Sequence, residues 1–415
     1  MKTRLRSRFR AIVVGVTASA AIATSAVVAT PAAHAAPDAP KAPAVQQAAA
    51  QRTAGPQAAS QQPATGRPQP TSHKQSVSSL AASPNAASVE GLIYVPITDE
   101  NAVWAINPST RTVVAKIANV GMHPIVLRAT PDHRKIYVDN FGPLQGQVTV
   151  IDTATNTITK KIATLGPAYA SEAMSPDGKF LLVPTAFSVV QKIDTATDKI
   201  VATFPIAFLP IDIEITPDTQ SFYAFATYGT VASYSSATGR KIKPSISVKG
   251  LAPGWAVLSK DGKTLYSINF LNSNIAIIDT EQWRVTRTVQ LPQGSWPLSA
   301  TLTQDESELW VADIGFGKDT YNLTIIDPAT ATVKQVLRTP TAPAYVGFSP
   351  DGKHAYVSDL GPVSNLPPVL RPLFYDIFYL LPPGQTGYID DYDVQTKQLL
   401  GRTETGTGPV AGVYF

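Results

Sequence analysis

The chain has 415 residues, no cysteine and a formal net charge of +4. Without cysteine it has neither disulfides nor a Cys-ligated metal centre, so a folded domain depends on buried apolar surface. Residues 1–35 carry five basic and no acidic side chains, and residues 36–88 add a net +3, which leaves −4 on the remainder. That balance provides no basic footprint for nucleic acid or anionic lipid.

Residues 1–35 have the features of a Sec-type signal peptide. A basic start from Lys2 to Arg10 precedes an apolar stretch, and Ala33-His34-Ala35 matches a small-x-small cleavage site. This segment has no twin-Arg pair and no lipobox cysteine. We expect a protein that is secreted, or held at the cell surface or in the periplasm; the alternative is an uncleaved membrane anchor.

Residues 36–88 are rich in Ala, Pro, Gln and Ser and contain no aromatic residue. Such a segment cannot bury enough apolar surface to offset its ordering entropy. We therefore expect a disordered linker between the signal peptide and a folded domain at 89–415.

A strand signal ending in Tyr-Val or a similar pair recurs seven times in that domain. Its central residues are Tyr94, Tyr137, Leu182, Tyr223, Tyr266, Trp310 and Tyr356. Their spacings of 43, 45, 41, 43, 44 and 46 residues are typical of one four-stranded propeller blade. The pattern predicts an all-β fold, a seven-bladed β-propeller of four-stranded antiparallel blades.

Each repeat divides into four expected strands. In five repeats the first strand runs from a proline to an aspartate eight residues later, as from Pro124 to Asp132, and ends in a tight turn. The third ends in Ile-Asp, with Asn107 or Ser235 at the same place in two repeats, and a Thr-rich turn follows. Asp and Thr side chains accept backbone hydrogen bonds in such turns. We interpret these aspartates as structural.

The first repeat lacks an inner strand, whereas the C-terminal residues 408–415 match the inner-strand pattern and have nothing after them. We therefore expect the C-terminal strand to join the N-terminal blade. Ring closure of this kind removes the open sheet edges.

Segments such as Val150-Ile151-Asp152-Thr153 and Ser349-Pro350-Asp351-Gly352-Lys353, with Tyr356-Val357 after the latter, resemble the YVTN-type β-propeller repeat. The resemblance covers about residues 90–415 and implies a seven-bladed propeller of the secreted, periplasmic or surface-layer kind. Related seven-bladed folds include lactonases and a streptogramin-opening lyase. One periplasmic member binds DNA, which the charge of −4 does not favour here.

Binding residues of a propeller usually lie on loops at one mouth of its channel. His123 is the histidine expected there, so a multi-histidine zinc site is excluded. Glu172, Asp212 and Glu214 could bind Ca²⁺ or Mg²⁺ through their oxygens. We expect no cofactor, however, and favour the interpretation that these carboxylates pair with Arg128 or are solvated.

Three aromatic residues, Trp255, Trp296 and Tyr345, are expected at a similar height near the same mouth. Aromatic faces there can stack on a sugar, a peptide or an aromatic ligand. The alternative is that these side chains pack between the blades.

The last repeat contains a long apolar insertion, residues 360–385, between its second and third strands. A long loop in a compact domain is usually functional or disordered, and this one is too apolar for disorder. Its aromatic residues Phe374, Tyr375, Phe378 and Tyr379 could cap the channel mouth and contact a ligand. Alternatively, residues 366–383 dock on a protein or a membrane surface, or form a short helix on the propeller flank.

These features predict a monomeric binding or scaffolding module with a small-molecule or protein ligand at the channel mouth and no nucleic-acid partner. The alternative is a lactonase-like hydrolase or lyase that uses His123 and the channel carboxylates, with or without a divalent metal. Nucleophilic triads have no support, since there is no Gly-x-Ser-x-Gly elbow and no cysteine.

Overall fold

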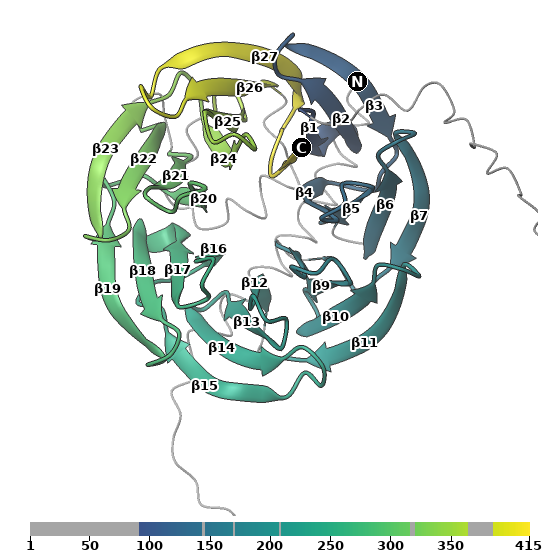
Figure 1. Cartoon of the computed structure of the whole chain (residues 1–415), viewed down its shortest axis with the longest axis vertical. Helices are drawn as coiled ribbons and strands as arrows, with labels where there is room; N and C mark the ends of the chain where they lie inside the picture. Colours follow the sequence, from purple (N-terminus) through teal and green to yellow (C-terminus); the bar gives the residue numbers. More distant parts are fainter. Residues whose placement is uncertain (1–90, 143–145, 169–170, 207–208, 316–319, 364–384) are drawn as a thin grey trace, which may run out of the picture. The chain divides into compact units, whose positions relative to one another are not determined.

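The computed structural model describes residues 91–415 except 143–145, 169–170, 207–208, 316–319 and 364–384. The described residues belong to one compact unit, Ala86–Phe415. They form seven four-stranded antiparallel sheets arranged in a ring, which is a seven-bladed β-propeller (Figure 1). The expected signal peptide (1–35) and linker (36–88) lie outside the described residues, as does most of the insertion.

Each blade has four strands, ordered from the innermost at the channel to the outermost at the circumference (Figure 1). We number the blades 1 to 7 along the chain, beginning with the blade that contains Ile93. The innermost strands of blades 2 to 7 are β4 (Pro124–Ala129), β8 (Ala173–Met174), β12 (Pro210–Ile215), β16 (Pro253–Leu258), β20 (Pro297–Leu302) and β24 (Pro343–Phe348), and that of blade 1 is β28 (Val413–Tyr414). The second strands, from blade 1, are β1 (Ile93–Ile97), β5 (Lys135–Asn140), β9 (Phe180–Thr185), β13 (Ser221–Ala226), β17 (Thr264–Asn269), β21 (Leu309–Asp313) and β25 (His354–Asp359).

The outer half of each blade is equally regular. The third strands are β2 (Ala102–Asn107), β6 (Gln147–Asp152), β10 (Val189–Asp194), β14 (Thr230–Ser235), β18 (Asn274–Asp279), β22 (Asn322–Asp327) and β26 (Thr386–Asp393). The fourth are β3 (Thr112–Ala118), β7 (Thr157–Ala163), β11 (Lys199–Pro205), β15 (Lys241–Ser247), β19 (Arg284–Gln290), β23 (Thr332–Arg338) and β27 (Leu399–Thr407). Short 3₁₀ turns η1 (Thr98–Glu100) and η2 (Phe270–Asn272) follow β1 and β17. None of the described residues belongs to a helix long and apolar enough to cross a membrane.

The turn between the first and second strands has the same hydrogen bonds in six blades. In blade 7, Ser349 Oγ donates to Asp351 Oδ1 (2.6 Å), which also accepts the Lys353 N–H (3.1 Å), while Ser349 Oγ accepts the His354 N–H (3.0 Å). The corresponding aspartates are Asp132, Asp177, Asp218, Asp261 and Asp305. The hydroxyl donor lowers the pKa of each aspartate.

The aspartates that the sequence predicts to be structural stand in the outer turn after the third strand, where Asp152 Oδ1 accepts the Thr155 N–H (2.8 Å). Equivalent bonds are made by Asp194, Asp279, Asp327 and Asp393, which confirms that prediction.

At the other end of each blade, the residue after the second strand donates a backbone hydrogen bond to the residue before the first. In blade 2 the Phe141 N–H bonds the His123 carbonyl (3.0 Å), and in blade 1 the Thr98 N–H bonds the Gly408 carbonyl (3.1 Å). The loops before strand one and after strand two therefore meet at one mouth of the channel, as the sequence predicts.

The C-terminus completes blade 1. Tyr414 of β28 pairs with Ile93 of β1, and the Phe415 N–H bonds the Leu92 carbonyl (3.0 Å) where the other blades have their turn. The Phe415 ring stacks on His133 of blade 2, with ring centroids 4.4 Å apart. The predicted ring closure is confirmed, although the paired strand is shorter than the expected 408–415.

Neighbouring blades are also joined by polar contacts that explain the tyrosine of the Tyr-Val signal. The Tyr94 hydroxyl of blade 1 donates to Asn156 Oδ1 in the outer turn of blade 2 (2.7 Å). The Tyr137 hydroxyl of blade 2 donates to Asp198 Oδ1 of blade 3 (2.5 Å), and Lys135 Nζ bonds the same carboxylate (2.8 Å). The ring of each tyrosine fills the core while its hydroxyl reaches the next blade.

Candidate ligand site in the channel

A β-bulge near the start of the first strand sets which side chains face the channel. The pairing register shifts between Pro210 and Asp212 in β12 and between Pro253 and Trp255 in β16. Bulges redirect side chains in this way. In each blade we consider the residue two places after the proline that begins the inner strand, or after Tyr169, which stands at that place in blade 3. These residues form one layer around the channel: Val126, Ser171, Asp212, Trp255, Ser299, Tyr345 and Ala411.

Four carboxyl groups gather on the side of the channel formed by blades 2, 3 and 4: Asp139, Glu172, Asp212 and Glu214. Asp139 and Glu172 are 0% exposed and Asp212 is 1% exposed. Within this cluster, five buried oxygens have no hydrogen-bond partner among the described residues, namely both of Asp139, both of Glu172 and Oδ2 of Asp212. Buried polar atoms in folded proteins are nearly always bonded. Five such oxygens in one cluster are therefore exceptional, and burial disfavours the charged form of each carboxyl group.

Arg128 of β4 lies among these carboxyl groups but bonds to other partners. Its Nη2 donates to Ser171 Oγ (3.0 Å) and its Nη1 to the Leu127 carbonyl (3.0 Å). Within the described part of the chain it forms no ion pair with a carboxylate. The expectation of pairing with Arg128 or solvation was wrong for Glu172 and Asp212, which are buried and form no ion pair with the guanidinium that Ser171 holds. Glu214 is half-buried and the charge of Arg128 acts on it.

Burial raises the pKa of all four carboxyl groups, and the positive charge of Arg128 opposes the change. The pKa of Glu214 rises to about 7. Burial also raises the pKa of Asp212 well above its ordinary value, and the charge of Glu214 adds to the rise. Burial likewise raises the pKa of Glu172 well above its ordinary value, and the charge of Asp139 adds to the rise. Burial also raises the pKa of Asp139. The cluster consists of two carboxyl pairs, and burial shifts each group toward its protonated form.

Aromatic side chains line the opposite side of the channel. The rings of Trp255 (β16) and Tyr345 (β24) have centroids 5.4 Å apart, and Tyr345 stacks on Tyr414 of β28 at 6.2 Å. The guanidinium of Arg128 lies 5.5 Å from the Trp255 ring centroid and so joins the two sides. Gly347 is required here, because a Cβ at that position would collide with the Tyr414 ring.

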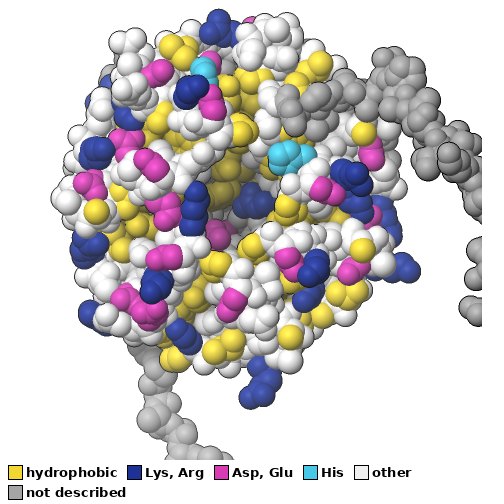
Figure 2. Space-filling model, in the orientation of Figure 1, with side chains coloured by type: hydrophobic (Ala, Val, Ile, Leu, Met, Phe, Trp, Pro, Cys, Tyr) yellow, Lys and Arg dark blue, Asp and Glu magenta, His cyan; other side chains and the backbone are white. Residues whose placement is uncertain are grey.

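An apolar cluster at the mouth includes Phe270, Leu360 and Val363. Trp296 packs against Phe270 at 4.9 Å between centroids, apart from the contact between Trp255 and Tyr345. Figure 2 shows one face of the ring, hollowed at its centre, with hydrophobic, basic and acidic side chains around the hollow. The structure thus brings Trp255 and Tyr345 into direct contact. Trp296, the third predicted aromatic residue, packs on the Phe270 part of the same apolar cluster.

The described start of the insertion is anchored at this mouth. Leu360 is fully buried, and the Val363 carbonyl accepts a hydrogen bond from the Tyr321 hydroxyl (2.7 Å). The predicted ligand contacts Phe374, Tyr375, Phe378 and Tyr379 lie outside the described residues.

His123 occupies different surroundings at the mouth. Its backbone N–H bonds Asn101 Oδ1 of blade 1 (2.9 Å). Burial lowers the pKa of its imidazole, and the charge of Asp99, also in blade 1, opposes that effect. The charge of Asp99 therefore affects the pKa of His123, whereas Arg128 and the neighbouring carboxyl groups affect the pKa values of Glu172 and Asp212.

The carboxyl cluster is not a preformed metal centre. In the part of the chain that the structure describes, no three His, Asp or Glu side chains converge closely enough to hold a metal ion. Glu172, Asp212 and Glu214 share one side of the channel without this convergence.

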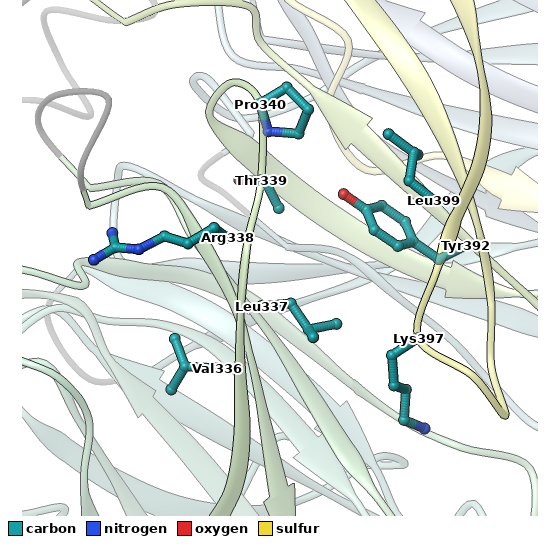
Figure 3. Close-up of a pocket in the computed structure, with 8 residues that line it drawn as sticks. All are labelled: Val336, Leu337, Arg338, Thr339, Pro340, Tyr392, Lys397 and Leu399. Atoms are coloured by element: carbon teal, nitrogen blue, oxygen red, sulfur yellow. The ribbon is translucent and has the colours of Figure 1, made fainter.

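A separate groove of about 510 Å³ lies at the circumference between blades 6 and 7 (Figure 3). It is lined by Val336, Leu337, Arg338, Thr339, Pro340, Tyr392, Lys397 and Leu399. Lys397 Nζ bonds Glu308 Oε2 (2.6 Å), which also accepts the Trp310 indole N–H (2.9 Å). Because its lysine is already paired and none of the predicted site residues lines it, the channel is the better candidate site.

The sequence analysis selected neither Asp139 nor Tyr414 as a site residue. A signal for Asp139 exists. It stands where the other second strands have Pro96, Pro184, Phe225, Ile268, Ala312 and Ser358. A carboxylate at a buried place that is otherwise apolar or small indicates a specific role.

The fold and the channel define a seven-bladed β-propeller with one acidic and one aromatic side to its channel. No protein-family model and no curated protein matches the chain. Among solved structures, it is similar to Kuenenia stuttgartiensis hydrazine synthase (TM-score 0.56, 20% identity, 69% of this chain and 88% of that one).

Two further structures have the same architecture. One is dihydro-heme d1 dehydrogenase NirN (TM-score 0.57, 15% identity, 79% of this chain and 76% of that one). The other is a functionally unknown protein from Desulfotomaculum acetoxidans (TM-score 0.59, 13% identity, 78% and 99%). At these identities the likeness concerns the fold alone.

Proposed function

We propose that this protein is a ligand-binding β-propeller whose channel takes a saccharide. The observation that supports it most is the contact between Trp255 and Tyr345, two half-buried rings on inner strands whose centroids lie 5.4 Å apart. Arg128 and Glu214, also half-buried, supply polar groups in the same channel. Sugar hydroxyls both donate and accept hydrogen bonds, and the C–H face of a sugar ring packs on an aromatic side chain. A saccharide therefore suits the aromatic and the polar groups at once.

Other ligand classes fit less well. A purely apolar ligand would cover the half-buried Arg128 and Glu214 without hydrogen-bonding them, at a cost of about 1–3 kcal/mol for each unsatisfied group. An acidic ligand would place negative charge beside Glu214, which is partly ionised at neutral pH because its pKa is about 7.

The proposal includes export and a contribution of the insertion to binding. The signal-like residues 1–35 direct the protein out of the cytoplasm, and the YVTN-type character of the repeats suits a periplasmic, surface or secreted propeller. The insertion starts at the mouth, where Leu360 and Val363 are buried. We propose Phe374, Tyr375, Phe378 and Tyr379, which lie outside the described residues, as further ligand contacts.

Titration calorimetry tests the proposal with three β-1,4-linked disaccharides: cellobiose, N,N′-diacetylchitobiose and chitobiose. Saturable binding of at least one is expected. Trp255→Leu should weaken that binding at least about tenfold, as for a central aromatic contact. Trp283→Leu is the matched control, because this tryptophan bonds the Pro244 carbonyl at the circumference (2.7 Å). The proposal fails if none of the three sugars binds, or if both variants behave alike.

Turnover of the bound sugar by a hydrolase or lyase reaction is the second candidate, favoured by Glu214. A carboxylic acid with a pKa of about 7 suits a general acid at neutral pH. Product analysis after prolonged incubation separates turnover from binding. If products form, Glu214→Gln should abolish them; intact sugar would leave binding as the function.

A further inference from the structure

We propose that the mouth face of blades 2 to 5 docks on a zwitterionic lipid surface, one whose headgroups carry no net charge. This inference does not depend on the ligand in the channel. The observation behind it is where the exposed apolar side chains lie. Among the described residues, large exposed hydrophobic side chains occur on the outermost strands and on the mouth loops of four consecutive blades (Figure 1). The second group, called here the apolar arc, comprises Met122, Leu165, Phe187, Tyr228 and Leu251.

The loops that carry the apolar arc touch one another. In blade 3 the two mouth loops are in contact, because the Phe187 ring lies against Gly166, where a Cβ would collide with it. In blade 4 the Thr227 carbonyl, next to Tyr228, accepts the Ala252 N–H of blade 5 (2.8 Å). Single exposed hydrophobic residues scattered over a surface would need no explanation, but a group on adjoining loops of one face indicates an interaction site.

Tight turns hold the two aromatic members of the arc at the tips of their loops. The Ser188 N–H bonds the Thr185 carbonyl (3.1 Å) and so closes a four-residue turn around Phe187. The turn of Tyr228 is closed in the same way by the Gly229 N–H (2.9 Å). Phe187 is 64% exposed and Tyr228 is 45% exposed. Because the backbone is already fixed, docking does not have to order these loops.

The mouth loops of blades 2 to 5 carry almost no charge. Among the described residues of these loops, Lys249 is the one exposed side chain that is ionised. At the opposite end of the same blades, each turn between the first and second strands contains an ionised aspartate: Asp132, Asp177, Asp218 and Asp261. The mouth face can therefore leave water at a lower cost than the opposite face.

A zwitterionic lipid surface matches this charge distribution. Anionic lipids attract clusters of Lys and Arg, whereas the arc has Lys249 alone and residues 89–415 have a net charge of −4. Leu, Phe and Met side chains enter the boundary between headgroups and acyl chains, and Tyr lies at the headgroup level. A fluid lipid surface also adapts to side chains on separate turn tips, whereas a protein partner would need a complementary pocket for each.

Co-sedimentation with vesicles tests the proposal. Residues 36–415 are used, because they contain the whole compact unit Ala86–Phe415 and omit the apolar start of the chain. Binding to phosphatidylcholine vesicles is expected. Added phosphatidylglycerol should not strengthen it, and added salt should not weaken it, since apolar contact rather than charge holds the protein.

Two pairs of serine substitutions localise the contact. Phe187→Ser combined with Leu251→Ser should weaken binding to phosphatidylcholine at least about tenfold. The matched control combines Val114→Ser with Val201→Ser, at side chains of similar exposure (57% and 58%) on the outermost strands β3 and β11. The control pair should bind as wild type does.

Tryptophan fluorescence gives a second measurement that does not depend on loss of binding. Phe187→Trp keeps an aromatic ring at the turn tip, and vesicles of brominated phosphatidylcholine should quench its emission more than that of wild type. Val201→Trp, on β11, should show no added quenching. Because Phe187→Trp retains the apolar contact, it decides the question even if the serine pair destabilises the protein.

Three results would overturn the proposal. One is the absence of binding to phosphatidylcholine vesicles. Another is binding that appears only when phosphatidylglycerol is present, since charge would then be the attraction. The third is an equal loss in the two serine pairs together with equal quenching of the two tryptophan variants, which would place any lipid contact away from the apolar arc.

Discussion

Arg128 lies over Trp255, with the guanidinium carbon 5.5 Å from the ring centroid, although the two residues stand on the inner strands of blades 2 and 5. The contact links the acidic side of the channel to the aromatic side. The same guanidinium is the positive charge that opposes the raised pKa of Glu214. Arg128 therefore contributes both packing and electrostatic stabilisation.

Replacing Arg128 by methionine keeps the alkyl chain and removes the charge. The pKa of Glu214 should then rise above 7, and the free energy of unfolding at pH 8 should fall by about 1–3 kcal/mol as a hydrogen-bonded charge is lost. The loss should be smaller at pH 5, where the carboxyl groups are protonated. Thermal melting at both pH values measures the difference. Arg134→Met, at a side chain that is 85% exposed, should change stability by less than about 0.5 kcal/mol. Equal effects at the two positions would contradict the role given to Arg128.

Stability of the wild-type protein should decrease as the pH rises from about 4.5 to 8. A carboxyl group whose folded pKa lies above its unfolded value binds more protons in the folded state, so its stabilisation is present below the unfolded pKa and lost as the pH rises through the folded pKa. Asp313, Glu214 and Asp359 each have a pKa raised to about 7, mainly by burial. The turn aspartates act in the opposite sense, but only at lower pH, since their pKa values are lowered.

The variant Asp313→Asn isolates one of these groups. Asp313 accepts a hydrogen bond from the Thr324 hydroxyl, which an amide oxygen can also accept. The variant should be more stable than wild type at pH 8, by on the order of 1 kcal/mol or more, with a smaller difference at pH 5. Asp132→Asn is the control, because this residue is exposed and the hydroxyl of Thr130 lowers its pKa, so it stays ionised over this pH range. Parallel wild-type and Asp313→Asn melting curves across pH would refute the assignment.

The blades were predictable because each repeats its own local chemistry. The turn at Asp351 and the outer-turn aspartates such as Asp152 bond to residues a few places away, so the pattern appears in the sequence. The channel was not predictable in the same way. Which side chains meet there depends on the bulge after each proline and on the ring geometry, which bring Arg128 to Trp255 and Asp139 to Glu172.

Backbone conformation before the inner strands was also invisible in the sequence. His123, Leu209, Ala252 and Trp296 all have a positive φ of 49–52° just before a proline. Their residue types are ordinary, so nothing in the sequence marks this conformation. It is not shared by every blade, since Ala342, before Pro343 in blade 7, is not among the residues of positive φ.

A matched pair of Ala→Gly substitutions tests whether this conformation is strained. Ala252 has a φ of 50°, which costs a non-glycine residue about 1–2 kcal/mol, whereas Ala256 lies within strand β16 and is not among the residues of positive φ. Ala252→Gly should leave the free energy of unfolding unchanged or raise it by up to about 1 kcal/mol. Ala256→Gly should lower it by about 1–2 kcal/mol, through lost backbone restriction and a lost buried methyl group. Chemical denaturation measures both, and equal losses would show that the left-handed position carries no strain.

The C-terminal residue tests ring closure. Phe415 is 4% exposed, stacks on His133 of blade 2 and caps the Leu92 carbonyl of blade 1, so it joins two blades at the point where the chain ends meet. Phe415→Ala should lower the free energy of unfolding by about 3 kcal/mol, as for other buried phenylalanines, and removal of residues 409–415 should lower it further by exposing the edge of β1. Phe187→Ala, at a ring that is 64% exposed, should cost less than about 1 kcal/mol. A truncated protein that resists proteolysis as well as the full chain would mean that blade 1 does not need its C-terminal strand.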